Sequence, residues 1–123
     1  MVAAVDLAQR VRKDVGEAIA AAIALEPDLV LTTGGTGLTP TDGTPEATRP
    51  LLHREVPGLA EAIRARGVAN GIPTAVLSRG LAGLAGRTLV VNLPGSSGGV
   101  RDALAVLAEV LPHALSQAQG GDH

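Results

Sequence analysis

The sequence predicts a layered α/β domain. Three observations support this: segments with helical periodicity alternate with short, fully apolar runs, two of those runs end in glycine-rich loops, and the length of 123 residues suits one domain. In open α/β sheets, ligands bind beyond the carboxyl ends of the strands. We therefore expect a single domain over residues 1–123, with its functional site at the glycine-rich loops.

The composition narrows the range of functions. Hydrophobic residues make up 46% of the chain, yet Phe, Tyr, Trp and Cys are absent, so the core must be built from Ala, Val, Leu and Ile. The chain therefore has no aromatic side chain on which a nucleic-acid base could stack. Its formal net charge of −2 also does not favour binding of a polyanion such as nucleic acid. No apolar run approaches the ~20 residues of a membrane-spanning helix, and residues 1–13 do not form a signal peptide. We expect no nucleic-acid or membrane partner and a cytoplasmic location.

The first third of the chain predicts a helix and a buried strand. Residues 5–13 alternate weakly between apolar and polar, which fits a strand or a helix. Apolar residues at helical spacing over 15–25 predict a helix, with Asp14 as its cap. The apolar run 29–32 is typical of a strand buried on both faces, and it leads into a glycine loop at 33–37.

The middle of the chain predicts two helices. Thr44 is expected to cap the first, with Pro45 at its first position, and the next proline should break that helix near Thr48. The second helix is expected over 59–66, closed by Gly67.

The last third predicts a hairpin and a final helix. Residues 74–84 and 88–93 are expected to form two strands joined by a tight turn. A helix should begin at about residue 100 and bend at Pro112. Residues 117–123 are expected to form a frayed tail.

The first candidate site is the glycine loop after the 29–32 strand. Consecutive glycines let backbone N–H groups converge on a phosphate, and threonine hydroxyls add donors. Asp42 close behind suits a Mg²⁺ ion that neutralises phosphates. Alternatively, the glycines only form a tight turn and Asp42 caps it. The candidate binding residues are Thr33, Gly34, Gly35, Thr36, Gly37 and Thr44.

The second candidate site is the turn formed by Pro94, Gly95 and Ser96 after the 88–93 strand. Backbone donors at the start of the following helix, together with serine hydroxyls, offer an anion site. The alternative is that Ser96 or Ser97 only caps this helix. Because both candidate loops follow buried strands of one sheet, we expect them to line the same pocket.

Other polar residues give weaker signals. Ser78 lacks the sequence context of a serine nucleophile, and its neighbour Arg79 could clamp a charged ligand or form a surface ion pair. The three histidines, His53, His113 and His123, lack the spacing of a metal site. Asp14 and Glu55 are further carboxylates that could face the cleft, although most such residues are solvated or capping.

Several motifs together resemble the Mog/MoaB molybdopterin adenylyltransferases, a family that includes the related domains of gephyrin. The matching segments, in order, are 32–37 (TTGGTG), 39–48 (TPTDGTPEAT), 55–58 (EVPG), 77–80 (LSRG) and 91–96 (VNLPGS). With 32–37 and 39–48 counted as one signature, these are four ordered matches, which are more specific than one glycine motif. The resemblance covers the chain from about Asp14 to the C-terminus, whose ending is similar to that of actinobacterial members.

The resemblance implies a three-layer α/β/α sandwich with a mostly parallel sheet and a β-hairpin. It also implies a homotrimer that transfers AMP from MgATP to the terminal phosphate of molybdopterin, releasing pyrophosphate, with a molybdenum-insertion protein as a further partner. Asp42 matches the aspartate on which the family relies, and Asp14 matches a second one, although Lys13 replaces the usual preceding proline. Glu55, Ser78 and the Pro94 to Ser96 turn match substrate-pocket positions.

The chain also departs from the family pattern. Family members usually begin with a strand, a Ser-Asp-Arg-like segment and a helix that would precede Met1, so we expect an N-terminally shortened member that lacks this first strand and helix. Gly43 replaces a larger residue after Asp42. These departures leave two alternatives to an active enzyme: a molybdopterin-binding or scaffolding module without turnover, and an oligomeric module of a larger fusion.

Overall fold

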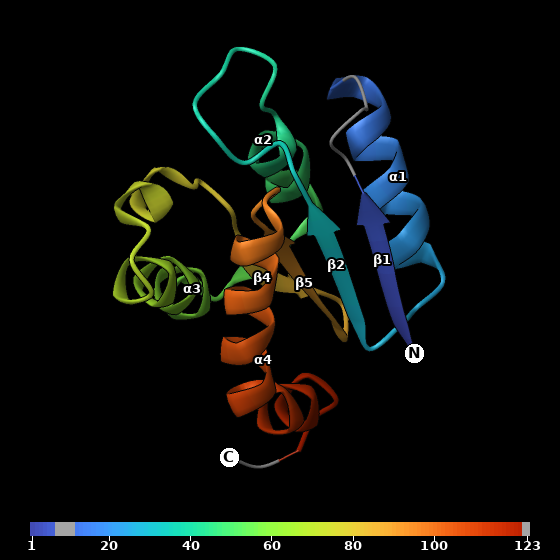
Figure 1. The fold of residues 1–123 in the computed structure, drawn as a ribbon. Coiled ribbons are helices and arrows are strands. Elements are labelled where there is room, and N and C mark those ends of the chain that lie inside the picture. Colours follow the sequence, from blue (N-terminus) through green and yellow to red (C-terminus); the bar gives the residue numbers. More distant parts are fainter. Residues whose placement is uncertain (7–11, 122–123) are drawn as a thin grey trace.

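A five-stranded mixed sheet forms the centre of the computed structural model, which describes residues 1–6 and 12–121. The pairs β1–β2 and β2–β5 are parallel, and β4 pairs antiparallel with both β5 and β3. The spatial order is β1-β2-β5-β4-β3 (Figure 1). The strands are β1 (Val2–Asp6), β2 (Leu29–Thr33), β3 (Arg54–Glu55), β4 (Ala82–Ala85) and β5 (Thr88–Leu93).

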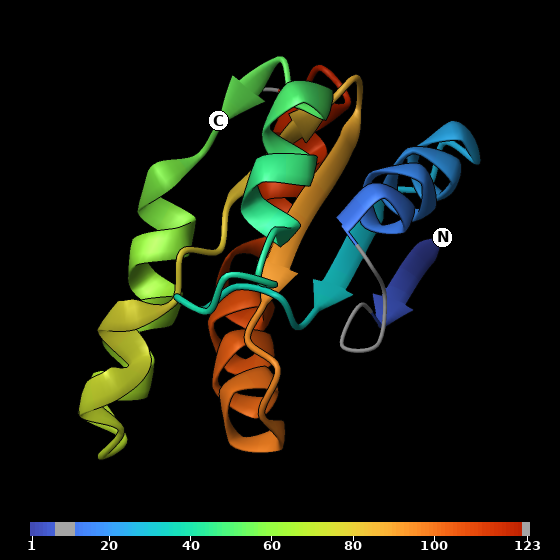
Figure 2. The same ribbon diagram turned by 90° about the horizontal axis from the view of Figure 1, so that it is seen from above.

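Helices cover both faces of the sheet, which gives three layers (Figure 2). One face packs against α1 (Arg12–Ala24) and α2 (Thr44–Thr48), and the other against α3 (Pro57–Ala69) and α4 (Ser97–Ala118). Two 3-10 helices follow α2 and α3: η1 (Arg49–Leu51) leads from α2 to β3, and η2 (Pro73–Leu77) leads from α3 to β4. The predicted α/β/α sandwich is confirmed. None of the described helices is both long and apolar enough to cross a membrane.

The central strands β2 and β5 are apolar because both of their faces are buried. Val30 and Val90, both 0% exposed, pack toward α1, whereas Leu29 and Leu89 belong to the cluster beneath α3 and α4. Successive side chains of a strand point to opposite faces, so a strand between two helical layers needs apolar residues at every position.

A buried polar network interrupts this apolar pattern at the carboxyl ends of β2 and β5. The Asn92 amide nitrogen donates to Thr32 Oγ1 at 2.9 Å and to Thr48 Oγ1 at 3.1 Å. The Leu81 N–H donates to Asn92 Oδ1 at 3.0 Å. All three polar side chains are almost completely buried, and their mutual hydrogen bonds offset the cost of burial. The network ties both strand ends to α2.

The N-terminal elements differ in position from the prediction. The strand lies at Val2–Asp6, before most of the 5–13 segment that the sequence left open between strand and helix, and residues 7–11 lie outside the described part. Asp14 lies in the first turn of α1 and not at its cap, because the helix already begins at Arg12.

Two helix boundaries in the middle of the chain also differ from prediction. Gly43 is the N-cap of α2, because the Thr44 hydroxyl donates instead to the Gly34 carbonyl at 2.9 Å. Gly67 is a buried interior residue of α3, where the absence of a side chain lets Ala75 approach closely. The predicted break near Thr48 is confirmed.

Only the last three residues of the predicted 74–84 strand, 82–84, belong to a strand. Residues 73–77 form η2, whose Val76 side chain is 61% exposed, and the ladder with β5 begins at Ala82. Pro73 starts the helical turns, and the backbone that follows bonds to the glycine loop through the Arg79 N–H and the Thr36 carbonyl. Tertiary contacts therefore override the β-branched composition.

The last helix is longer than predicted at both ends. It begins at Ser97, with Ser96 as its N-cap, and runs through Pro112 to Ala118. The Gln119 side-chain amide then donates to Asp28 Oδ1 at 2.8 Å. Residues 117–118 of the predicted tail thus belong to α4, and residues 122–123 lie outside the described part.

Candidate functional site

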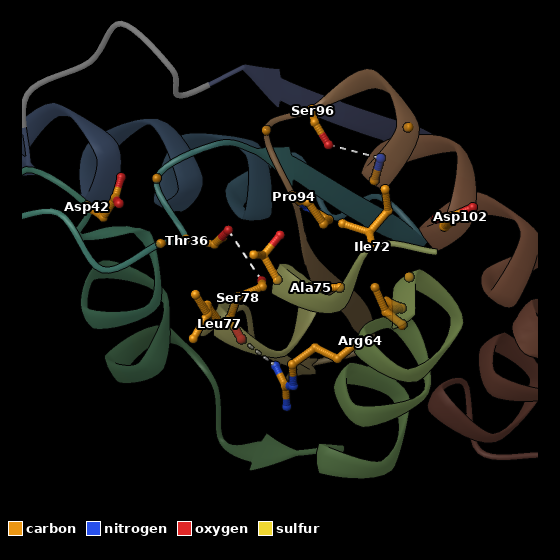
Figure 3. Close-up of a pocket in the computed structure, with 18 residues that line it drawn as sticks. Thr36, Asp42, Arg64, Ile72, Ala75, Leu77, Ser78, Pro94, Ser96 and Asp102 are labelled. Atoms are coloured by element: carbon orange, nitrogen blue, oxygen red, sulfur yellow. Dashed lines mark hydrogen bonds between the residues drawn. The ribbon is translucent and has the colours of Figure 1, made fainter. Parts of the chain in front are cut away.

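The two candidate loops lie together at one edge of the sheet. Because β2 and β5 are parallel neighbours, their carboxyl ends meet there, and the Gly34 N–H donates to the Leu93 carbonyl at 3.3 Å. A Cβ on Gly95 would lie only 3.4 Å from the Gly34 Cα. Both loops line one pocket of about 420 Å³, within the range of small-molecule sites (Figure 3). The predicted two-loop pocket is confirmed.

Positive φ angles and a neighbouring threonine fix the glycine loop. Gly34 has φ 90° and Gly35 has φ 70°, which is the left-handed region that favours glycine. A Cβ on Gly35 would collide with the Thr44 side chain, while the Thr44 N–H donates to the Gly35 carbonyl at 3.1 Å. Gly35, Thr36 and Gly37 line the pocket, whereas Thr44 supports the loop from behind.

Asp42 both lines the pocket and stabilises a turn. Its Oδ2 accepts the Thr39 N–H at 3.1 Å, and its own N–H donates to the Thr39 carbonyl at 3.0 Å. The alternative role as a turn residue is therefore present in the structure. Its other oxygen, Oδ1, accepts no hydrogen bond from the described part of the chain, which leaves one carboxylate oxygen for a ligand.

Arg79 holds the loop that carries Asp42. Its Nε donates to the Gly37 carbonyl at 2.8 Å, its Nη2 to the Asp42 carbonyl at 3.1 Å, and its Nη1 to Glu46 Oε2 at 2.6 Å. The hydrogen bond that Arg79 donates to the Glu46 carboxylate raises the pKa of Arg79 above its ordinary value. The sequence left open a ligand clamp or a surface ion pair. The ion pair with Glu46 is present, and the guanidinium also fixes the backbone at Gly37 and Asp42. Arg79 is therefore a positioning residue.

Ser78 lies in the pocket wall opposite the glycine loop. Its hydroxyl is 3.4 Å from Thr36 Oγ1, so the two hydroxyls come from segments far apart in sequence (Figure 3). Arg64 Nη1 supports this segment by donating to the carbonyls of Ser78 at 3.2 Å and Gly80 at 3.1 Å. Sequence reasoning missed Arg64, because an arginine on a helix surface carries no motif.

The remaining pocket wall comes from α3, η2 and α4. Ser96 Oγ accepts the Gly99 N–H at 3.0 Å, so this serine caps α4 and lines the pocket at the same time. Asp102, in the second turn of α4, also lines the pocket and was not identified from the sequence. The apolar lining residues are Ile63, Ile72, Ala75, Leu77 and Pro94.

Two predicted carboxylates are not brought into this pocket. Asp14 lies on α1, and Glu55 lies on the exposed edge strand β3 with Oε1 3.8 Å from Arg49 Nη2. His53 and His113 lie elsewhere on the molecule, beside other hollows, and His123 lies outside the described part. Among the described residues, no three His, Cys, Asp or Glu side chains gather as a metal site.

Comparisons with known proteins show which family the chain resembles. A family model described as "Probable molybdopterin binding domain" matches residues 3–113. The molybdenum cofactor synthesis protein cinnamon of Drosophila melanogaster is 48% identical over 87 residues, 71% of this chain and 14% of that protein. A molybdopterin adenylyltransferase of Helicobacter pylori is 40% identical over 88 residues, 72% of this chain and 49% of that protein.

Solved structures give the same result for the fold. The Mog protein of molybdopterin biosynthesis from Mycobacterium ulcerans superposes with a TM-score of 0.83 and 57% identity, covering 86% of this chain and 69% of that one. The chain thus spans half or less of the two curated relatives described above. The matched model, these relatives and the two-loop pocket lead to one conclusion: the chain belongs to the Mog/MoaB family of molybdopterin-binding domains of molybdenum cofactor biosynthesis.

Proposed function

We propose that this chain transfers AMP from MgATP to the terminal phosphate of molybdopterin. A molybdopterin phosphate oxygen attacks the α-phosphorus of ATP, the bond from that phosphorus to the bridging oxygen breaks, and pyrophosphate leaves. One observation carries the proposal: two glycine-rich loops and the Asp42 carboxylate converge on a single pocket in a member of a molybdopterin-binding family. The adenylyltransferase name of the Helicobacter pylori relative supports the reaction type.

The pocket offers donors suited to phosphate groups. Thr36 and Ser78 contribute hydroxyls, and the glycine loop contributes backbone N–H groups. Fixed donors stabilise charge that develops on a transferring phosphoryl group, so positioning and electrostatics supply the catalysis without a covalent intermediate.

Asp42 is the residue proposed to hold Mg²⁺. Mg²⁺ takes one or two protein carboxylates and fills its other positions with water and phosphate oxygens, so a single carboxylate with an unengaged oxygen fits this ion. Bound there, the ion would neutralise charge on the ATP phosphates. Asp14, which lies outside the pocket, remains a prediction from the family resemblance alone, and so does Glu55.

The proposed partners follow from the same family. We expect a homotrimer in the cytoplasm that hands adenylyl-molybdopterin to a molybdenum-insertion protein. The alternative function is a molybdopterin-binding or scaffolding module without turnover.

Pyrophosphate release separates the two functions. The purified chain is incubated with molybdopterin, ATP and Mg²⁺, and pyrophosphate is measured over time. Release that requires all three components supports the transferase. Tight molybdopterin binding without release supports the binding module, and absence of both contradicts the proposal.

A further inference from the structure

The pocket has two carboxylates at opposite ends. In Figure 3, Asp42 lies at one end and Asp102 at the other, with Thr36, Ser78 and Pro94 between them. The hydroxyls suited to phosphate lie on the Asp42 side, and the apolar side chain of Ile72 lies on the Asp102 side. The two ends therefore suit different parts of one ligand.

A hydrogen bond holds the Asp102 carboxylate in place, but no cationic side chain of the described residues pairs with it. Asn70, at the end of α3, donates its side-chain N–H to Asp102 Oδ1 at 2.7 Å. Its Oδ2 accepts no hydrogen bond, and the carboxylate has no ion pair, among residues 1–6 and 12–121. An ionised carboxylate has about four acceptor positions, so Asp102 keeps acceptor capacity for a ligand.

The acceptor capacity suits one edge of a pterin ring. The 2-amino-4-oxopyrimidine part of a pterin carries adjacent N–H donors, at N3 and on the 2-amino group, which one carboxylate can accept side by side. Apolar side chains beside that carboxylate, such as Ile72, suit the flat faces of the ring. A phosphate, by contrast, would be repelled by Asp102.

We propose that Asp102 is the specificity-determining residue for the pterin ring, accepting hydrogen bonds from its N3–H and 2-amino groups. Molybdopterin then lies with its ring at the Asp102 end and its phosphate at the Thr36 and Ser78 hydroxyls, where AMP transfer takes place beside Asp42. This assignment rests on the proposed function, because it takes molybdopterin as the ligand. It adds the direction in which the substrate lies.

Two ring compounds that differ only at position 2 test the assignment. 6-Hydroxymethylpterin carries the 2-amino donor, and 6-hydroxymethyllumazine carries an oxygen acceptor there. The chain contains no Phe, Tyr or Trp, so the fluorescence of either ring can be titrated without emission from the protein. The parent chain should bind the pterin about tenfold or more tightly than the lumazine, the size expected for one charge-assisted hydrogen bond.

Substitutions at the two ends of the pocket should separate their roles. Asp102→Asn offers one donor and one acceptor in place of two acceptors, so the preference for the pterin should disappear. Asp42→Asn at the other end should leave the ratio of the two affinities unchanged. Asn70→Ala keeps the carboxylate and removes the hydrogen bond that orients it, so it should reduce the ratio without abolishing it. If Asp102→Asn does not fold, the affinity ratio of Asn70→Ala tests the assignment: a reduced ratio supports it, and a parental ratio contradicts it.

The outcomes distinguish this assignment from the proposed function. If Asp102→Asn folds and keeps the parental ratio, or if the parent chain binds both rings equally, the assignment is overturned. Pyrophosphate release from ATP and molybdopterin would then show that the transferase function stands without it. If the parent binds neither ring and releases no pyrophosphate, the assignment and the proposed function fail together.

Discussion

At the scale of single residues, the site depends on side chains that have two tasks. Ser96 caps α4 and lines the pocket, and Asp42 closes a turn with Thr39 while it faces the same pocket. From the sequence, each of these residues could have had either a structural or a functional role, and in the structure each makes the structural contact and also faces the pocket. For Asp42, the informative substitution is therefore one that keeps the hydrogen bond with Thr39 and removes only the charge.

Asp42→Asn should lower AMP transfer roughly a hundredfold, the loss expected for one electrostatic stabiliser. Folding should barely change, because the asparagine oxygen can still accept the Thr39 N–H. The measurements are thermal melting and AMP transfer to molybdopterin at saturating Mg²⁺. Glu61→Gln, which removes an exposed carboxylate on α3, is the matched control. Unchanged transfer with unchanged melting would mean that Asp42 serves only the turn.

Arg79→Lys should lower kcat about tenfold or more while the KM for ATP changes little. Lysine keeps the charge, but its single ammonium cannot reach Gly37, Asp42 and Glu46 together, so the loop carrying Asp42 shifts. Steady-state kinetics give the split between kcat and KM. Arg101→Lys, on the exposed side of α4, is the control and should behave as the parent. A parental kcat for Arg79→Lys would show that this positioning is not needed.

At the scale of elements, the sequence predicts secondary structure correctly where local residues determine it. The prediction fails where contacts between distant segments determine the conformation. The strand at 29–32, the hairpin turn before β5 and the break near Thr48 were predicted correctly, because local apolar runs, glycine and proline set them. Residues 74–81 were predicted wrongly as strand. The conformation of that segment is set by its hydrogen bonds to Thr36 in the glycine loop, which lies some forty residues earlier in the sequence.

The same distinction applies to the site. Glycine and serine loops after apolar strands have a local signature, so the two-loop pocket could be predicted. Arg64 and Asp102 lie on helices as ordinary charged residues, and only the packing of α3 and α4 brings them to the pocket. The sequence alone therefore does not indicate that Arg64 and Asp102 line the pocket.

Asn92→Ala should destabilise the domain by about 2–3 kcal/mol, because it leaves the Leu81 N–H and the Thr32 hydroxyl buried without their partner. Urea unfolding followed by circular dichroism measures this. Thr41→Ala removes only an exposed contact with Thr39 and should change stability by less than about 0.5 kcal/mol. Equal stability of the two variants would contradict a structural role for the buried network.

At the scale of the whole molecule, we expect a homotrimer. Several large apolar side chains are exposed, among them Val68 at 41% and Val110 at 40%, and association would cover part of such surface. Light scattering should give three times the 12.3 kDa mass of one chain. A monomer at micromolar concentration that is stable to heating would contradict this expectation, and dilution across that range is the control for weak association.

The buried amide of Asn92 also protects the chain against an alternative alignment of its own strands. Thr32 and Asn92 are directly opposite each other in the β2–β5 ladder. A slip by one residue would turn the asparagine toward the leucine-rich face beneath α4, where it would lose these partners. The same slip would offset the glycine loop from the Pro94 turn by about 3.3 Å, one residue of strand rise. Misaligned chains would therefore be unstable as well as inactive. The hydrogen bond between Asn92 and Thr32 thus favours one strand alignment, and that alignment is the one that assembles the pocket.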